Sequence, residues 1–154
     1  MLERILLIDD CEEDAVLIRN ALRKSGLEDP VFCIRDAEEA VAYLKGDREY
    51  ADREQYPIPS ILLLDVHMPK MSGLELLRWL KQQPELNRVL VVMLTRPEDT
   101  RQIQEAFRLG ALSYLNKGGP AEEFQGFVAF ARGYAQISKL IPDYTEKAAV
   151  GGKR

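Results

Sequence analysis

The sequence predicts an α/β protein whose parallel five-stranded sheet lies between two layers of helices, a three-layer sandwich. Two observations lead to this fold class. Short, almost continuous apolar runs, typical of strands buried on both faces, occur five times along the chain. Each run is followed by a segment whose apolar residues recur at helical spacing. Such β–α units imply parallel strands joined by right-handed crossovers, and the length of 154 residues suits one domain.

The predicted elements alternate from one end of the chain to the other. The strands are the apolar runs at residues 4–8, 31–35, 61–64, 89–94 and 112–116. The helical patterns cover residues 14–25, 36–46, 72–80, 97–110 and 121–140. A polar connection at residues 47–60, with two prolines, is expected to be the least regular segment.

Local signals support the starts of several helices. Asp36 with Glu39, and Ser72 with Glu75, have the spacing of a capping box. Pro97 suits the first turn of the fourth helix, where its missing N–H costs nothing. The apolar residues of that helix are expected to face the core: Ile103, Ala106 and Phe107.

Composition narrows the class of protein. The net charge of −4 gives no overall electrostatic reason to bind nucleic acid or an anionic membrane directly. The N-terminal MLERILLIDD is charged at once, unlike a signal peptide, and no apolar run has the roughly 20 residues of a membrane helix. We expect a cytoplasmic protein with one domain at residues 1–141, no attached output domain, and a flexible tail at residues 142–154.

Polar residues follow four of the five predicted strands. Asp9 and Asp10 follow the first, Asp65 the third and Thr95 the fourth, while Lys117 comes just after the fifth. Parallel strands bring these ends to one edge of the sheet, where open α/β folds bind ligands. Gathered carboxylates repel one another unless a cation neutralises them, and Mg²⁺ prefers such oxygen ligands. The edge therefore suits phosphoryl transfer onto a carboxylate.

These residues resemble a known family. From Glu3 to Leu140 the chain is similar to the receiver domain of two-component response regulators. The resemblance rests on DD after the first strand, LLLDVHMPKMSGLELL around the third, LT after the fourth and YLNK at the fifth, all in order. It implies a stand-alone, chemotaxis-regulator-like receiver with a flavodoxin-like strand order of 2-1-3-4-5.

The resemblance also implies a role for each residue of the strand ends. Asp65 would accept a phosphoryl group from a phosphohistidine of a sensor histidine kinase. Asp10 and Asp65 would bind Mg²⁺ directly, Asp9 would act partly through water, and the backbone carbonyl of His67 would complete the set. The chain would thus be a signalling protein and not an enzyme, beyond its own phosphorylation and slow dephosphorylation.

Two further residues would bind the phosphoryl group. Thr95 and Lys117 would contact its oxygens, and Tyr114 would turn inward when Thr95 moves toward the phosphate. This switch would shift the face made by the fourth helix, fifth strand and fifth helix, and so change partner binding or dimerisation. Tyr114 has an alternative interpretation as an ordinary half-buried strand residue.

The sequence departs from the usual receiver pattern at two positions, and it also resembles one subgroup of the family. Arg96 stands after Thr95, where a small residue is usual, so it narrows the pocket or pairs with an acidic group. Gly118 stands after Lys117, where proline is usual, which puts the customary cis peptide in question. The non-proline at 118, the long connection at 47–60 and the extended last helix resemble small response regulators that serve bacterial and cyanobacterial phytochromes. That subgroup implies a phytochrome-type kinase partner.

Two other functions stay open at this point. A pseudo-receiver would bind partners without phosphorylation; the intact acidic set argues against it, while Arg96 keeps it open. A phosphohydrolase that works through an aspartyl phosphate normally has a second Asp two residues after the nucleophile, and here that position is His67.

The last helix has two apolar stripes. One stripe forms an ordinary core face: Phe124, Val128, Ala131 and Ala135. The second stripe consists of Phe130, Tyr134, Ile137 and Ile141. Either the tail covers it, or it forms a surface for a partner or for a homodimer, and we favour such a surface.

Overall fold

The computed structural model describes residues 4–28 and 30–138, and in these residues it contains one parallel five-stranded sheet. The spatial order of the strands is β2-β1-β3-β4-β5. The strands are β1 (Ile5–Ile8), β2 (Phe32–Ile34), β3 (Ile61–Asp65), β4 (Leu90–Thr95) and β5 (Ser113–Asn116). The predicted three-layer fold and its flavodoxin-like strand order are confirmed, and each strand lies within about one residue of its predicted bounds.

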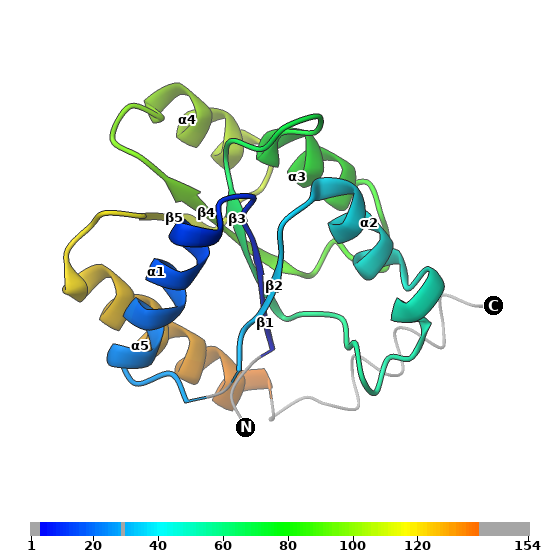
Figure 1. Cartoon of the computed structure of the whole chain (residues 1–154), viewed down its shortest axis with the longest axis horizontal. Helices are drawn as coiled ribbons and strands as arrows, with labels where there is room; N and C mark the ends of the chain where they lie inside the picture. Colours follow the sequence, from blue (N-terminus) through cyan, green and yellow to red (C-terminus); the bar gives the residue numbers. More distant parts are fainter. Residues whose placement is uncertain (1–3, 29, 139–154) are drawn as a thin grey trace.

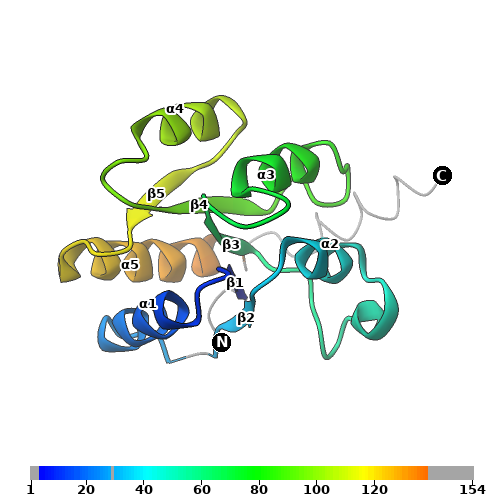
Figure 2. The same ribbon diagram turned by 45° about the horizontal axis from the view of Figure 1, so that its top comes forward.

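Five helices cover the two faces of the sheet (Figures 1 and 2). They are α1 (Glu12–Lys24), α2 (Ala37–Lys45), α3 (Gly73–Lys81), α4 (Thr100–Arg108) and α5 (Ala121–Ser138). Helices α1 and α5 lie on one face, and α2, α3 and α4 lie on the other. This division is what right-handed crossovers from a central β1 toward both edges of a sheet produce.

Successive residues of the buried strands belong to opposite cores. In β1, Leu6 and Ile8 pack toward α2 and α3, while Ile5 and Leu7 pack toward α1 and α5. All four are buried, which explains why the strand has a continuous apolar run instead of alternation. The two cores hold the sheet between them and thereby fix the positions of its carboxyl ends.

Helix α4 differs from the prediction. It begins at Thr100, three residues after Pro97, and Asp99 stands at its N-cap. Ala106 is buried as expected, but Phe107 is exposed. The buried Asp99 explains the later start, because its carboxylate accepts a hydrogen bond from the Arg96 N–H and holds the preceding turn together.

The connection at residues 47–60 is more ordered than predicted. It contains a 3-10 helix, η1 (Arg48–Ala51), and is held against α2 by Arg53. The guanidinium of Arg53 donates to the carbonyls of Tyr43 and Leu44, in the last turn of α2, at 2.8 Å each. Gly46 ends α2 with a φ of 74°, and a side chain there would collide with Arg53. The connection is therefore attached to the end of α2.

The predicted core face of α5 is buried: Phe124, Val128, Ala131 and Ala135. Phe127 joins this core as well, which the sequence pattern did not predict. On the second stripe, Phe130 and Ile137 are exposed and Tyr134 is half-buried. Ile141 and the tail at residues 142–154 lie outside the described residues, so their predicted roles stay predictions. Within the described part of the chain, no helix is both long enough and apolar enough to cross a membrane.

Candidate functional site

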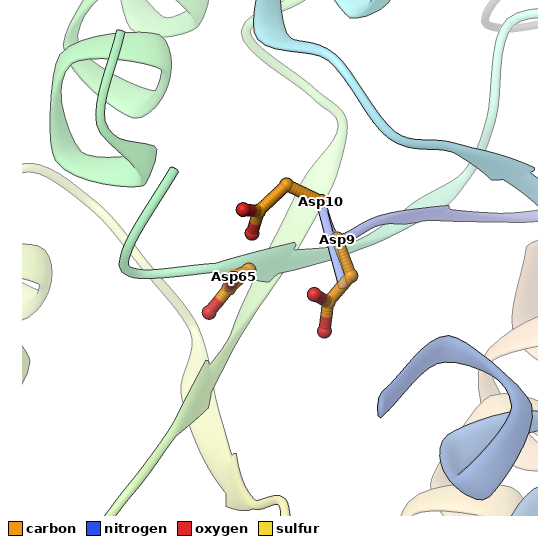
Figure 3. A group of neighbouring side chains, drawn as sticks. All are labelled: Asp9, Asp10 and Asp65. Atoms are coloured by element: carbon orange, nitrogen blue, oxygen red, sulfur yellow. The ribbon is translucent and has the colours of Figure 1, made fainter. Parts of the chain in front are cut away.

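The three acidic residues predicted from the strand ends lie together. Asp9 directly follows β1, Asp65 is the last residue of β3, and Asp10 lies beside them (Figure 3). One carboxylate oxygen from each lies within 4.8 Å of the other two. Asp9 and Asp65 are buried and Asp10 is exposed, so the cluster opens to solvent on the Asp10 side.

The main chain after β3 is packed closely enough to hold Asp65 in place. Gly73, the first residue of α3, lies so near that a Cβ there would come within 2.0 Å of the Asp65 carbonyl oxygen. The Gly73 N–H donates to the Val66 carbonyl at 3.0 Å. Ser72 caps α3 by accepting a hydrogen bond from the Glu75 N–H, as predicted. Only glycine fits this close approach between the start of α3 and the Asp65 main chain.

A single buried ammonium group, that of Lys117, forms ion pairs with three carboxylates. Lys117 Nζ lies 2.8 Å from Asp9, 3.0 Å from Asp14 and 3.1 Å from Asp65. Burial acts to lower the pKa of Lys117, but these carboxylates outweigh burial and hold its pKa above the usual value. One positive charge therefore faces an excess of negative charge.

The pKa of Asp65 is raised by this excess of negative charge. Burial and the neighbouring charge of Asp9 raise the pKa of Asp65 to about 7, against the opposing effect of Lys117. A carboxylate so disfavoured in its charged form gains from any further positive charge placed beside it.

The acidic cluster fits a divalent cation. Asp9 Oδ2 is fully buried, and its partner in the described residues is the Lys117 ammonium at 2.8 Å, which Asp9 shares with Asp14 and Asp65. A buried carboxylate that shares one cation with two other carboxylates keeps negative charge that is not neutralised, which is costly in a folded protein. Together with Asp10 and Asp65 it provides the hard oxygen ligands that Mg²⁺ and Mn²⁺ select. The His67 N–H points back to Asp65 Oδ1 at 3.4 Å, so the His67 main chain borders the same cluster.

The two predicted switch residues are on neighbouring strands. Thr95 is buried at the end of β4, and its hydroxyl donates to the Leu115 carbonyl at 3.3 Å. Tyr114 is exposed, and its ring packs edge-on against Phe107 at 6.3 Å. In this structure the tyrosine thus lies on the α4–β5 surface and not in the core.

Two acidic residues of this region were not predicted as part of it. Asp14, in the first turn of α1, accepts hydrogen bonds from both Lys117 and Arg96. The predicted pairing of Arg96 with an acidic group is thereby confirmed, at 2.7 Å. The available signal for Asp14 was its place in the first turn of the helix that follows Asp9 and Asp10.

Asp99 is the second residue that sequence reasoning missed. It is buried and accepts from the Arg96 N–H at 2.8 Å, while its other oxygen bonds the His67 ring at 2.7 Å. It therefore joins the loop after β3 to the loop after β4. No periodicity marks it, because it lies in a turn between a strand and a helix.

Comparison with known proteins agrees with this geometry. A family model described as the response regulator receiver domain matches residues 5–128. Response regulator Rcp1 of Synechocystis sp. is 34% identical over 113 residues, which cover 73% of this chain and 75% of Rcp1. A crystal structure of the Mn²⁺-bound form of Rcp1 has a TM-score of 0.72 at 31% identity, over 84% of this chain and 94% of that one.

Two further solved structures are similar over most of the chain. The phosphorylated cyanobacterial phytochrome response regulator RcpA has a TM-score of 0.72 at 30% identity, over 88% of this chain and 95% of that one. The bacteriophytochrome response regulator RtBRR has a TM-score of 0.73 at 32% identity, over 84% and 77% respectively. With the strand-end carboxylates and the buried lysine in place, the chain belongs to the response regulator receiver domain family.

Proposed function

We propose that this protein is a stand-alone response regulator that accepts a phosphoryl group from a sensor histidine kinase onto Asp65. The observation that carries the proposal is the pairing of Asp65 with Lys117 at 3.1 Å inside a cluster of three carboxylates. Such a cluster holds unfavourable negative charge that a bound cation would relieve, and the same cation would neutralise the oxygens of an incoming phosphoryl group. The phosphorylated form of RcpA and the Mn²⁺-bound form of Rcp1 support both parts of this assignment.

In the proposed reaction a carboxylate oxygen of Asp65 forms a bond to phosphorus, and the bond from phosphorus to the kinase histidine breaks. Lys117 donates to a phosphoryl oxygen from its position beside Asp65, and the Thr95 hydroxyl donates to another. Asp9, Asp10, Asp65 and the His67 carbonyl would hold Mg²⁺, which would supply the positive charge that offsets the repulsion between an anionic carboxylate and an anionic donor. The electron pair of the broken bond goes to the histidine nitrogen, and the chain's own contribution is orientation and charge.

The test is phosphorylation by a small donor. With Mg²⁺ and acetyl phosphate, the intact mass is expected to rise by about 80 Da, the mass of one phosphoryl group. Asp65→Asn removes the acceptor and is expected to give no adduct. Asp36→Asn is the matched control, because Asp36 also follows a strand but caps α2, a role that asparagine keeps.

The same experiment distinguishes the two other functions. No adduct in any form of the protein would favour a pseudo-receiver that binds partners without phosphorylation. Rapid multiple turnover of phosphomonoesters would favour a phosphohydrolase. An adduct that persists in Asp65→Asn would place the acceptor elsewhere.

For the output, we propose that phosphorylation draws Thr95 away from the Leu115 carbonyl and that Tyr114 then turns inward. Phe107 loses the ring it now contacts, so the α4–β5–α5 surface changes shape. The second stripe of α5 lies near this surface and forms the homodimer interface. Its exposed Phe130 and Ile137 are the side chains that such an interface would bury.

Sedimentation tests the homodimer. The wild type is expected to have a larger mass at high concentration than a variant carrying Phe130→Asp and Ile137→Asp. A variant with Val16→Asp and Leu17→Asp is the control, because these two apolar residues are exposed on a different helix, α1. Equal masses for the wild type and the α5 variant would exclude the interface.

We further propose a cytoplasmic protein whose kinase partner is of the phytochrome type. The likeness to RcpA and RtBRR, both phytochrome response regulators by name, supports this. A phosphorylated phytochrome-type kinase should transfer its phosphoryl group to this chain within seconds to minutes and to Asp65→Asn not at all. A phytochrome-type kinase gene beside this gene would support the same pairing.

A further inference from the structure

The loop between β5 and α5 carries Lys117 and then two glycines, Gly118 and Gly119. The Lys117 ammonium lies 2.8–3.1 Å from three carboxylates, so the main chain from which it extends has to be held accurately. On its amino side this main chain is tied to β4, because the Lys117 N–H donates to the Thr95 carbonyl at 2.9 Å. On its carboxyl side two glycines restrain the chain least of all residues, so the position there depends on contacts of the loop.

Asn116, the last residue of β5, makes three such contacts. Its side-chain Oδ1 accepts a hydrogen bond from the Gly118 N–H at 3.1 Å, and its carbonyl accepts from the Gly119 N–H at 2.9 Å. Its own N–H donates at 3.2 Å to Oε2 of Glu123, which lies in the first turn of α5. The main chain on both sides of Lys117 is therefore connected to Asn116, and through it to α5.

Gly119 lies against the two groups that make these contacts. A Cβ at this position would come within 2.6 Å of Glu123 Oε2 and 3.0 Å of the Asn116 carbonyl oxygen. At Gly118 a Cβ would meet nothing within 4 Å, and neither glycine has a positive φ. Only Gly119 is therefore required to be glycine, and the approach of the Glu123 carboxylate to Asn116 is what requires it.

We propose that Asn116 and Glu123 form a polar clasp that positions the Lys117 ammonium for phosphoryl transfer onto Asp65. The proposal rests on the function proposed above and names two positioning residues for it. Both act through the main chain of Lys117 and not through the reacting atoms. Because a misplacement of about 1 Å can slow a reaction by a factor on the order of a hundred, a few hydrogen bonds in this loop are enough to affect the rate.

The clasp differs from an ordinary stabilisation of the helix end. Acidic residues in the first turn of a helix interact favourably with its dipole, and α5 has two of them, Glu122 and Glu123. Glu123 accepts from the Asn116 N–H, whereas the exposed Glu122 makes no hydrogen bond to this loop among the residues that the structure describes. An effect on the dipole would be shared by both residues, and a positioning effect would belong to Glu123 alone.

The experiment measures the rate of adduct formation with acetyl phosphate and Mg²⁺ by intact mass. In this reaction a carboxylate oxygen of Asp65 bonds to phosphorus, and the bond from phosphorus to the bridging oxygen breaks, so that acetate leaves with the electron pair. Glu123→Ala is expected to react about tenfold more slowly than the wild type. Glu123→Gln keeps an oxygen that can accept from the Asn116 N–H and should recover most of the rate. Glu122→Ala is the matched control and should equal the wild type.

The two glycines provide a second pair of variants. Gly119→Ala brings a methyl group against the Glu123 carboxylate and should also slow the reaction, whereas Gly118→Ala has room for its methyl group and should not. Glu123→Ala combined with Gly119→Ala should be no slower than the slower single variant, because both changes release the same clasp.

Three results would overturn the clasp while the wild type still forms an adduct. The first is a rate for Glu123→Ala equal to that of the wild type. The second is an equal loss of rate in Glu122→Ala and Glu123→Ala, which would assign the effect to the helix end. The third is a Glu123→Gln variant as slow as Glu123→Ala, since charge and not the hydrogen bond would then matter. No adduct in any variant, the wild type included, would instead overturn the proposed function, and with it the role of the clasp in phosphoryl transfer.

A measurement without metal or donor tests the position of Lys117 itself. In the metal-free protein, the buried Lys117 ammonium is expected to give a nitrogen NMR signal whose protons exchange slowly with water. Glu123→Ala should accelerate this exchange, whereas Glu123→Gln and Glu122→Ala should leave it as in the wild type. The same exchange rate in Glu123→Ala and the wild type would show that the ammonium keeps its place without Glu123, and would overturn the clasp independently of any phosphorylation assay.

Discussion

Two polar regions of this protein differ in whether the chain itself supplies enough partners for their charged groups. In the connection between α2 and β3, Arg53 donates to three carbonyls, and the Tyr50 hydroxyl donates to Glu39 at 2.7 Å. At the carboxyl edge of the sheet, one cation, Lys117, is shared by three carboxylates, those of Asp9, Asp14 and Asp65. The first region is satisfied by the chain itself, whereas the second needs something the chain does not supply.

The pKa values of the two regions show the same contrast. Burial and the hydrogen bond to Glu39 raise the pKa of Tyr50 to about 12, so the neutral hydroxyl is stable where it lies. Burial and the charge of Asp9 raise the pKa of Asp65 to about 7, so its charged form is unstable where it lies. Polar groups whose hydrogen bonds are made within the chain stabilise the protein. Charged groups whose pKa values are shifted by unneutralised neighbours instead indicate a functional site.

The largest expected effect is the loss of Lys117. Lys117→Met leaves buried carboxylates without their cation, and it should lower the free energy of unfolding by about 3–5 kcal/mol in chelator at pH 8. Urea unfolding measures this. Lys81→Met is the control, because Lys81 is a partly buried lysine that contacts only carbonyls in the described residues. If Lys117→Met and Lys81→Met lost equal amounts of unfolding free energy, the carboxylates at the site would not depend on Lys117 for their neutralisation.

The next effect is the pH dependence of the metal-free protein. Because the pKa of Asp65 rises from 3.8 to about 7 on folding, the folded protein holds a proton that the unfolded chain has lost between these values. Through this group the free energy of unfolding therefore falls as pH rises from about 4 to about 7. Calorimetric melting in chelator measures the trend, and Mg²⁺ should remove it.

Asp65→Asn is the variant that isolates this trend. It should be more stable than the wild type in chelator at pH 8 and should lack the fall with pH, whereas Asp36→Asn should keep it. Stability of the metal-free wild type that rises steadily with pH through this range would be evidence against the raised pKa of Asp65.

The smallest effect belongs to the satisfied region. Arg53→Met removes hydrogen bonds to three carbonyls and should lower the free energy of unfolding by about 2 kcal/mol, with no dependence on Mg²⁺. Arg48→Met removes only a surface ion pair with Glu39 and should cost at most about 1 kcal/mol. If Mg²⁺ restored Arg53→Met selectively, the two regions would not be independent.

Much of the site was predictable because its residues stand at strand ends. Asp9, Asp65 and Thr95 each stop an apolar run, and parallel strands bring such ends together. Asp14 and Asp99 were not predictable in this way. They reach the site from a helix and a turn, and their contacts depend on how α1 and the loop after β4 pack against the sheet.

Helix α4 shows a second limit of the pattern. Its apolar spacing predicted Phe107 in the core, but the residue is exposed and contacts Tyr114. Periodicity identifies an apolar face without identifying what covers it. A buried Asp99 stands at the N-cap of α4, and how the helix packs on the sheet decides that Ala106 and not Phe107 is buried.

The sequence by itself determined the order of the strands and helices, the parallel sheet and the set of acidic residues at its edge, because apolar runs and their polar ends are local properties of the chain. Only the tertiary structure decided how the charges share their partners. Lys117 lies between Asp9, Asp14 and Asp65, and Arg96 reaches α1, through contacts between residues as many as 103 positions apart. Such distances are set by packing, since no local signal in the sequence records which side chains meet once the layers close.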